Sequence, residues 1–219
     1  MEHYFRMFTS LVGRRCAIAA CIFSATPLSA ATSDSEFWIE LGAQGQISDN
    51  AELKLEVEQR RREGADEYIL GAAVDVEVAS NLELGGGLEL HDQGGFTEIR
   101  PYQQLTFAAG PLSFRSRIEE RFFDEAEQVS LRLRQRVQFT QSLGPRTRAL
   151  ASAELLYQLQ DRTEGGSQRI DQWRFIAGVR HRVAERLDLT GGYLFQIRPR
   201  PDGATRHTHV PQLYVTYRF

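Results

Sequence analysis

The chain contains few residues that support sulfur chemistry. Only two of its 219 residues are cysteines, and both, Cys16 and Cys21, lie within the first 30 residues. If that segment is removed on export, the rest of the chain has no disulfide, thiolate nucleophile or cysteine metal site. An uninterrupted run of about 18 apolar residues is also missing, which excludes a transmembrane helix. Lysine is nearly absent too, since Lys54 is the only one.

The first 30 residues have the pattern of a secretory signal. Two arginines precede an apolar stretch, residues 16–28, and small residues follow it. We therefore predict that residues 1–30 are a signal peptide cleaved near Ala30, and that residues 31–219 are one exported domain. A lipoprotein signal ending at Cys21 is the alternative, but its apolar core would be shorter than the usual ~7–15 residues.

Acidic and basic residues are distributed unevenly along the chain. Residues 31–98 hold 16 acidic and 4 basic residues, a net charge of −12. Residues 99–219 hold 12 acidic and 19 basic residues, a net charge of +7. Because the whole chain has a formal net charge of −3, it lacks the basic character of a protein that binds nucleic acid.

From Phe37 onward, apolar residues recur with a period of two rather than 3.6. Around residues 131–137, for example, Leu131, Leu133 and Val137 alternate with arginines. An extended strand with this pattern has one apolar face and one charged face. The pattern predicts eleven strands, near residues 36–47, 51–61, 68–78, 82–91, 97–108, 112–123, 129–140, 149–159, 172–183, 187–196 and 208–219.

The predicted strands are long, and their connections alternate in length. Strands of globular proteins average ~5–6 residues, whereas strands that cross a membrane need ~9–11. Tight turns at 48–50, 79–81, 109–111 and 184–186 alternate with mostly longer loops, as in outer-membrane barrels, whose short turns are periplasmic. We therefore predict an all-β fold, an antiparallel transmembrane up-and-down β-barrel of 10–12 strands. Its location would be the outer membrane of a Gram-negative-type bacterium.

The number of strands stays open at this point. Bacterial single-chain barrels have an even number of strands, so either 36–47 is not an ordinary wall strand or two strands are merged. A soluble sandwich, with the apolar faces buried between two sheets, is the alternative fold. Strand length favours the barrel, as do aromatic residues near the strand ends, among them Phe37, Trp38 and Phe122.

In a barrel, the charged face must line the lumen, because an arginine or lysine that faces lipid at the midplane costs about 2–4 kcal/mol. Strand order in a meander is spatial order, so acids and bases should line opposite arcs of the wall. The predicted acidic arc consists of Glu52, Glu56, Glu58, Asp75, Glu77, Glu83, Glu89 and Glu98. The predicted basic arc consists of Arg100, Arg115, Arg117, Arg121, Arg132, Arg134, Arg136, Arg174 and Arg180. Lys54, Arg60, Arg182, Glu119 and Glu154 are further predicted lumenal residues.

Two functions suit such a charge-segregated lumen. In the first, arginine side chains bind carboxylates through two parallel hydrogen bonds and fill a narrow barrel with an ion-paired core. The barrel then has a structural role and conducts nothing. Alternatively, the lumen is a narrow, porin-like channel for small charged solutes, and Gly71, Gly85, Gly87, Gly178 and Gly192 on the inner face leave room for it. Both interpretations predict a protein that is not an enzyme and that holds no cofactor and no metal.

The end of the chain resembles a recognised signal. Phe219 is the last residue, with Tyr217, Val215 and Leu213 at every second position before it. This ending looks like the C-terminal signal by which the barrel-assembly machinery recognises outer-membrane barrels. The resemblance implies that this machinery and the outer-membrane lipids are partners.

Three short motifs carry a second resemblance. They are Arg115-x-Arg117-x-Glu119-x-Arg121, Arg132-x-Arg134-x-Arg136 and Gly191-Gly192-Tyr193. With these motifs the chain resembles the proteobacterial outer-membrane barrel family called domain of unknown function 2490. The resemblance implies a barrel fold and an outer-membrane location, and it supplies no reaction and no catalytic residues.

An outer-membrane lipid or peptide hydrolase is the alternative function. It would use His91 beside Asp92, or His207 with His209, near strand ends predicted to be extracellular. Adjacent residues point to opposite faces of a strand, so His91 and Asp92 would need a loop geometry to act together. The sequence also lacks a Gly-x-Ser-x-Gly elbow and a His-Glu-x-x-His zinc motif.

Overall fold

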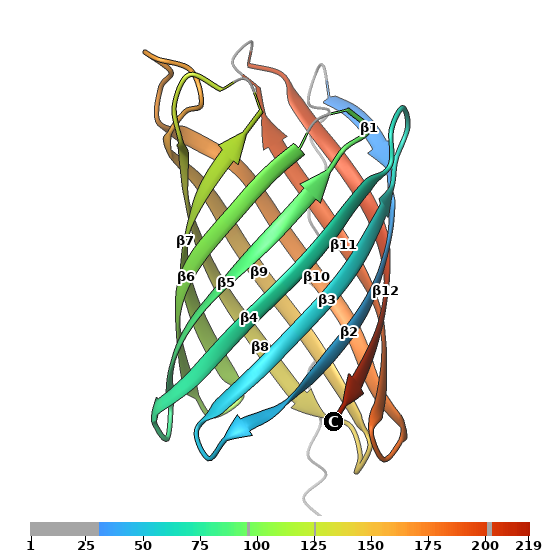
Figure 1. Ribbon diagram of the computed structural model, residues 1–219. Helices are drawn as coiled ribbons and strands as arrows, with labels where there is room; N and C mark the ends of the chain where they lie inside the picture. The colour runs from blue at the N-terminus through green and yellow to red at the C-terminus, as the bar shows by residue number, and fades with distance from the viewer. Residues whose placement is uncertain (1–30, 96, 125, 201–202) are drawn as a thin grey trace, which may run out of the picture.

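The computed structural model describes residues 31–95, 97–124, 126–200 and 203–219 (Figure 1). The predicted signal peptide and its cleavage site at Ala30 lie outside the described residues. In these ranges no helix is long and apolar enough to cross a membrane. The strands are β1 (Ala31–Ser35), β2 (Phe37–Ser48), β3 (Ala51–Arg61), β4 (Glu67–Ala79), β5 (Leu82–Asp92), β6 (Thr97–Ala109), β7 (Leu112–Phe123), β8 (Ser130–Ser142), β9 (Thr147–Gln160), β10 (Arg169–Ala184), β11 (Leu187–Pro199) and β12 (Thr205–Arg218).

The strands form one closed barrel. Each strand from β2 to β12 pairs with the next in antiparallel fashion, and β12 also pairs with β2, which closes the ring. The barrel fold predicted from the sequence is therefore confirmed. The sandwich alternative is wrong, because the ring leaves no second sheet against which an apolar face could pack. Accordingly, Val137 lies on the outer face with 38% of its surface exposed.

The closing seam is parallel. Gln212–Arg218 of β12 pair with Trp38–Gln44 of β2, and both strands run in the same direction. β1 continues β2 along the same edge of β12, and the Glu36 amide between them donates to the His209 carbonyl at 2.9 Å. An antiparallel closure requires an even number of strands, whereas a parallel closure requires an odd number. The wall accordingly has eleven strands, so the expectation of an even number is wrong and residues 36–47 belong to an ordinary wall strand.

The two ends of the barrel differ, as the connection lengths predicted. At one end, turns of two residues join β2 to β3, β4 to β5, β6 to β7 and β10 to β11, and residues 143–146 join β8 to β9. Longer connections join the strands at the opposite end, at the top of Figure 1, where β1 also lies. The C-terminus lies at the short-turn end. We refer to these as the long-loop end and the short-turn end.

The barrel has only a small apolar cluster inside. Trp38, Leu194 and Val210 are buried together, and Ile176 packs against them. Trp38 therefore points inward. The prediction that it belongs to the aromatic residues that face the membrane near the strand ends is wrong. The parity of β2 explains this, because Trp38 shares its face with Glu40 and Gln44, which also line the interior. Most large apolar side chains instead lie exposed on the outer face.

Candidate functional site: the barrel interior

A cavity of about 890 Å³ lies inside the barrel. At the long-loop end its lining includes Arg162, in the connection between β9 and β10, and Arg169, the first residue of β10. Toward the short-turn end its lining includes Lys54, Glu83 and Thr216. The cavity therefore follows most of the length of the barrel, and its walls are mainly charged and polar side chains.

The structure places the members of the predicted basic arc along this cavity. All nine line it: Arg100, Arg115, Arg117, Arg121, Arg132, Arg134, Arg136, Arg174 and Arg180. Lys54, Arg60 and Glu154 line it as well, whereas Arg182 pairs with Asp188 near the short-turn end. Alternation explains the placement, since Leu131 and Leu133 of β8 point outward where Arg132 and Arg134 point inward.

The members of the predicted acidic arc divide into three groups. Those that line the large cavity are Glu56, Glu58, Asp75, Glu83 and Glu89. Glu52 and Glu77 line a separate hollow of about 70 Å³ at the short-turn end, together with Asp75 and Glu83. Glu98 is fully buried behind its arginine partners and does not line the large cavity.

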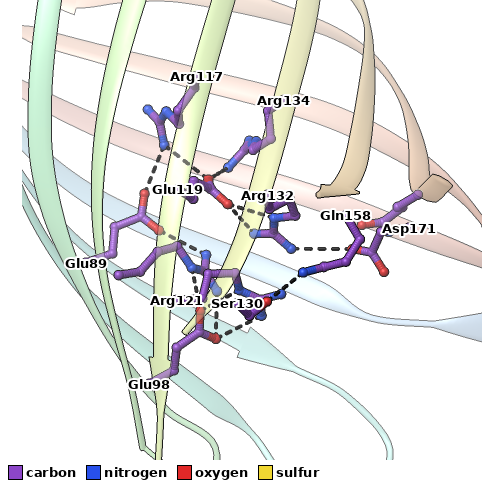
Figure 2. Close-up of polar contacts among 12 residues, drawn as sticks. Glu89, Glu98, Arg117, Glu119, Arg121, Ser130, Arg132, Arg134, Gln158 and Asp171 are labelled. Carbon is purple, nitrogen blue, oxygen red and sulfur yellow. Dashed lines mark hydrogen bonds and ion pairs between the residues drawn. The ribbon is translucent and has the colours of Figure 1, made fainter. Parts of the chain in front are cut away.

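Glu119 of β7 is, like Glu98, an interior carboxylate that is 0% exposed (Figure 2). Its two oxygens accept hydrogen bonds from Arg132 Nε and Arg134 Nη1, both at 2.7 Å. Arg132 reaches farther, to Asp171 at 3.4 Å. A buried charge is tolerated only when it is paired and hydrogen-bonded. Glu119 meets this condition because Arg132 and Arg134, both on β8, bind it.

Glu154 of β9 is the second anchor of the arginines. It accepts from Arg115 at 2.7 Å and from Arg134 at 2.9 Å, so Arg134 bridges Glu119 and Glu154. Glu154 is 3% exposed and lies within the basic side of the wall. These two glutamates therefore neutralise part of the basic arc from within.

A third cluster lies toward the long-loop end. Glu98 receives two hydrogen bonds from Arg100, at 2.7 and 2.9 Å, and two from Arg121, at 2.7 and 3.0 Å. Paired parallel bonds of this kind are the strongest form of arginine–carboxylate contact. Arg100 and Arg117 also bind Glu89, at 3.1 and 3.0 Å, so the acidic and basic arcs are joined across β5, β6 and β7.

Several charged side chains facing the cavity have no close partner, among them two acids and two bases. Glu40, Glu56, Arg136 and Arg180 line the cavity, and within the described ranges none makes a hydrogen bond or a close ion pair with another residue. The two acids come from β2 and β3, and the two bases from β8 and β10. Free carboxylates therefore face free guanidinium groups across open space.

Buried polar atoms without partners also belong to the cavity wall. Among the described residues these atoms are Arg62 Nε, Arg115 Nε, Gln196 Nε2 and Gln212 Oε1. All four residues line the cavity. Buried polar groups in proteins almost always find a partner, and water supplies it where the protein does not.

Two inner glycines make room for long side chains. A Cβ on Gly71 would lie 2.6 Å from the Glu56 side chain, and one on Gly87 would lie 2.6 Å from Tyr102. Glu56 and Tyr102 thus lie flat over positions that carry no side chain. The close approach of these side chains explains why glycine occupies both positions.

Two acids of the interior, Glu40 and Glu67, were not predicted from the sequence. Glu40 of β2 lines the cavity, and its alternation with Ile39 and Leu41 in the sequence is the signal for its inward face. Glu67 was assigned to a loop, yet it begins β4 and accepts from His91 Nδ1 at 2.8 Å. A strand that starts one residue earlier than predicted is sufficient to bring Glu67 inside.

The histidines considered for a hydrolase occupy different environments. His91 is 0% exposed, and its Nε2 lies 3.0 Å from Glu89, so carboxylates occupy both ring nitrogens. His207 and His209 pack against Phe195, and His209 also contacts the Tyr193 hydroxyl. Neither His207 nor His209 lines the cavity. In the described part of the chain, no cluster of three or more histidine, cysteine or acidic side chains is arranged to hold a metal ion.

The residues of the resembled assembly signal lie along the outer face of β12. Leu213 and Val215 are partly buried, whereas Tyr217 and Phe219 are about half exposed. The Phe219 amide donates to the Gln44 carbonyl at 3.1 Å across the seam. The ring of Phe219 covers Gly45, where a Cβ would lie 2.5 Å from it. The role of these residues in assembly stays a prediction.

Comparison with solved structures shows the same fold in a known porin, NanC. The NanC porin matches with a TM-score of 0.51 and 9% sequence identity, covering 77% of this chain and 90% of that one. The KdgM porin, solved in complex with disordered oligogalacturonate, matches with a TM-score of 0.49 and 11% identity, covering 73% and 88%. At these identities the likeness concerns the fold alone. No curated protein sequence matches this chain.

A family model matches residues 35–207, which is most of the chain. The model is described as a protein of unknown function, DUF2490. The match extends from β1 into β12 and so includes all three motifs on which the resemblance was based. The chain therefore belongs to the DUF2490 family.

Proposed function

We propose that this chain is an outer-membrane barrel whose interior is a narrow, water-filled channel for small charged solutes. The observation that carries the proposal is the cavity of about 890 Å³, lined by charged side chains from the long-loop end to the short-turn end. Barrels of about eight strands are filled by side chains and those of 16–18 leave wide channels, so eleven strands suit a narrow passage.

Two further features support water and ions inside the barrel. Four buried polar atoms of the lining have no partner among the described residues, which suits contact with lumenal water. Glu40 and Glu56 face Arg136 and Arg180 across the cavity, which gives a field transverse to the barrel axis. A solute with both a positive and a negative group could satisfy both sides of such a field.

The ion-paired plug is the second candidate. The network of Glu119, Glu154 and Glu98 with their arginines favours it, since these groups fill one side of the lumen. In a plug these pairs would hold the barrel together and no ions would pass. The two candidates therefore differ in conductance.

The test is planar-bilayer conductance of purified protein and of two single variants. Arg136→Gln removes a free positive charge, and Glu56→Gln removes a free negative charge, without breaking a close ion pair of the described residues. A unit charge acts on an ion about 4 Å away with ~1 kcal/mol in water, so we expect the cation-to-anion permeability ratio to change a few-fold. Arg136→Gln should raise the ratio and Glu56→Gln should lower it.

Arg61→Gln is the matched control for Arg136→Gln, because Arg61 is exposed at the end of β3 and does not line the cavity. Its permeability ratio should equal that of the parent protein. Absence of conductance in folded parent protein would contradict the channel and favour the plug. Equal ratios in all variants would show that ions do not pass these side chains.

A further inference from the structure

The outer face of the barrel carries an unexpected group of polar side chains. Gln103 of β6, Ser116 of β7 and Gln135 of β8 all belong to the outward-facing set of their strands, and none of them lines the cavity. Each lies near the middle of its strand. We call these three residues the outer polar patch.

The patch is contiguous. Ser116 is the cross-strand partner of Gln135, and Gln135 Nε2 donates to Ser116 Oγ at 2.7 Å. Gln103 pairs with Ile118, so it lies diagonally across from Ser116 on the same face. Gln103 and Gln135 are exposed, and no described residue offers the Gln103 amide a hydrogen bond. The patch thus presents free amide donors and acceptors.

Apolar side chains surround the patch toward both rims. Leu105 and Phe107 of β6 are exposed on one side of Gln103, and Ile99 on the other. On β8, Val137 and Phe139 are exposed toward the short-turn end. In a membrane-spanning barrel, these neighbours place the patch inside the hydrocarbon layer, where lipid tails cannot form hydrogen bonds with an amide.

Other strands carry apolar residues where the patch is polar. Leu55 of β3, Leu70 of β4 and Val179 of β10 are exposed on the outer face of the opposite and neighbouring parts of the wall. Small residues lie beside the patch instead: Gly86 on β5 is the cross-strand partner of Gln103, and Ala153 on β9 lies diagonally across from Gln135. Small and polar side chains together are typical of surfaces where membrane-embedded elements pack against protein.

We propose that the outer polar patch is the interface through which two copies of this chain form a dimer in the membrane. Two copies with the same orientation in the bilayer are related by a two-fold axis along the membrane normal. Such an axis brings together only residues that lie at the same depth in the membrane. The three patch residues meet this condition because each lies near the middle of its strand. An axis through Ser116 brings Gln103 of each copy against Gln135 of the other.

This arrangement satisfies the polar groups of the patch. An amide is both a donor and an acceptor, so Gln103 and Gln135 are complementary, and the symmetry repeats the contact. The neighbouring small residues Gly86 and Ala153 allow the two walls to approach closely. The dimer depends on the barrel lying in a membrane but not on an open channel.

Disulfide cross-linking in outer-membrane vesicles tests the geometry. A Ser116→Cys chain should form a covalent dimer on oxidation, because the two cysteines would face each other across the axis. Gln103→Cys and Gln135→Cys chains should cross-link when they are co-expressed and only weakly when each is present alone. Leu55→Cys, on the opposite part of the wall, is the matched control, and the parent chain measures cross-linking through Cys16 and Cys21.

Folding of each variant is checked by the different migration of heated and unheated protein on gels. As a second measurement, sedimentation in detergent compares the parent with the Gln103→Leu, Gln135→Leu double variant. The double variant should dimerise about tenfold more weakly, since polar contacts between membrane-embedded elements are modest in strength. Equal cross-linking at Ser116→Cys and Leu55→Cys would overturn the proposal. Cross-linking of Ser116→Cys to a different protein would overturn it as well. So would a parent protein that, like the double variant, sediments as a monomer.

Discussion

Single residues of the barrel interior divide into paired and free charges, and the two kinds have different roles. Glu119 accepts from two arginines and is 0% exposed, whereas Glu56 and Arg136 have no close partner among the described residues. Removal of one member of a buried pair leaves the other charged and desolvated. The paired residues should therefore govern stability, and the free ones should govern what the cavity accepts.

Glu119→Gln should destabilise the barrel strongly. The substitution leaves Arg132 and Arg134 short of a counter-charge in a buried site, and losses of this kind amount to about 3–5 kcal/mol. Urea unfolding in detergent, followed by gel migration, measures the change. Glu63→Gln in the exposed β3–β4 connection is the control and should leave the midpoint unchanged. If both variants unfold at the same urea concentration, Glu119 does not anchor the arginines.

At the level of strands, the parallel seam between β2 and β12 is the distinctive element. Parallel pairing is slightly less stable per residue than antiparallel pairing, and here only seven residues of each strand pair. β1 extends the same edge by five further pairs. Phe219 covers Gly45 at the short-turn end of the seam. Each end of the seam thus has its own reinforcement.

Gly45→Ala should weaken this seam. The new Cβ would lie 2.5 Å from the Phe219 ring and 2.8 Å from the Phe219 carbonyl oxygen, so the last residue must move. This displacement would also lengthen or break the hydrogen bond from the Phe219 amide to the Gln44 carbonyl. Overpacking of this kind costs about 1–3 kcal/mol, which urea unfolding can detect. Gly144→Ala, where nothing lies within 4 Å, is the control, and equal losses in both variants would contradict a role for the Phe219–Gly45 contact.

On the scale of the whole molecule, the two ends of the barrel should face different compartments. The two-residue turns and the C-terminus share one end, and the longest connections share the other (Figure 1). In outer-membrane barrels the short turns are periplasmic and the longer loops are extracellular. The unpaired charges of the cavity would then lie between the outside and the periplasm.

Cysteine labelling in intact Gram-negative cells tests this orientation. Gly165→Cys lies in the β9–β10 connection and Gly110→Cys in the β6–β7 turn, and both glycines have positive φ, at 77° and 59°, so the two substitutions are matched in backbone strain. A membrane-impermeant maleimide should label Gly165→Cys directly. It should label Gly110→Cys only after the outer membrane is permeabilised. The reverse pattern would mean that the barrel is inserted the other way.

The sequence by itself determined which face of each strand most side chains occupy. Alternation is a local property, and it was sufficient to place Arg132, Arg134 and Arg136 on one side of β8 and Leu131 and Leu133 on the other. It also predicted the strands to within a few residues and the two classes of connection. It failed at Glu67, where a strand began earlier than its turn signals indicated.

Only the tertiary structure decided how the wall closes and which charges meet. The parallel seam depends on where the first and last strands arrive after ten antiparallel steps, which no local pattern encodes. The choice of Glu119 and Glu154 as anchors depends on the register between β7, β8 and β9. Register is set by contacts between strands distant in sequence, so periodicity predicts the inward face of a residue but not its partner.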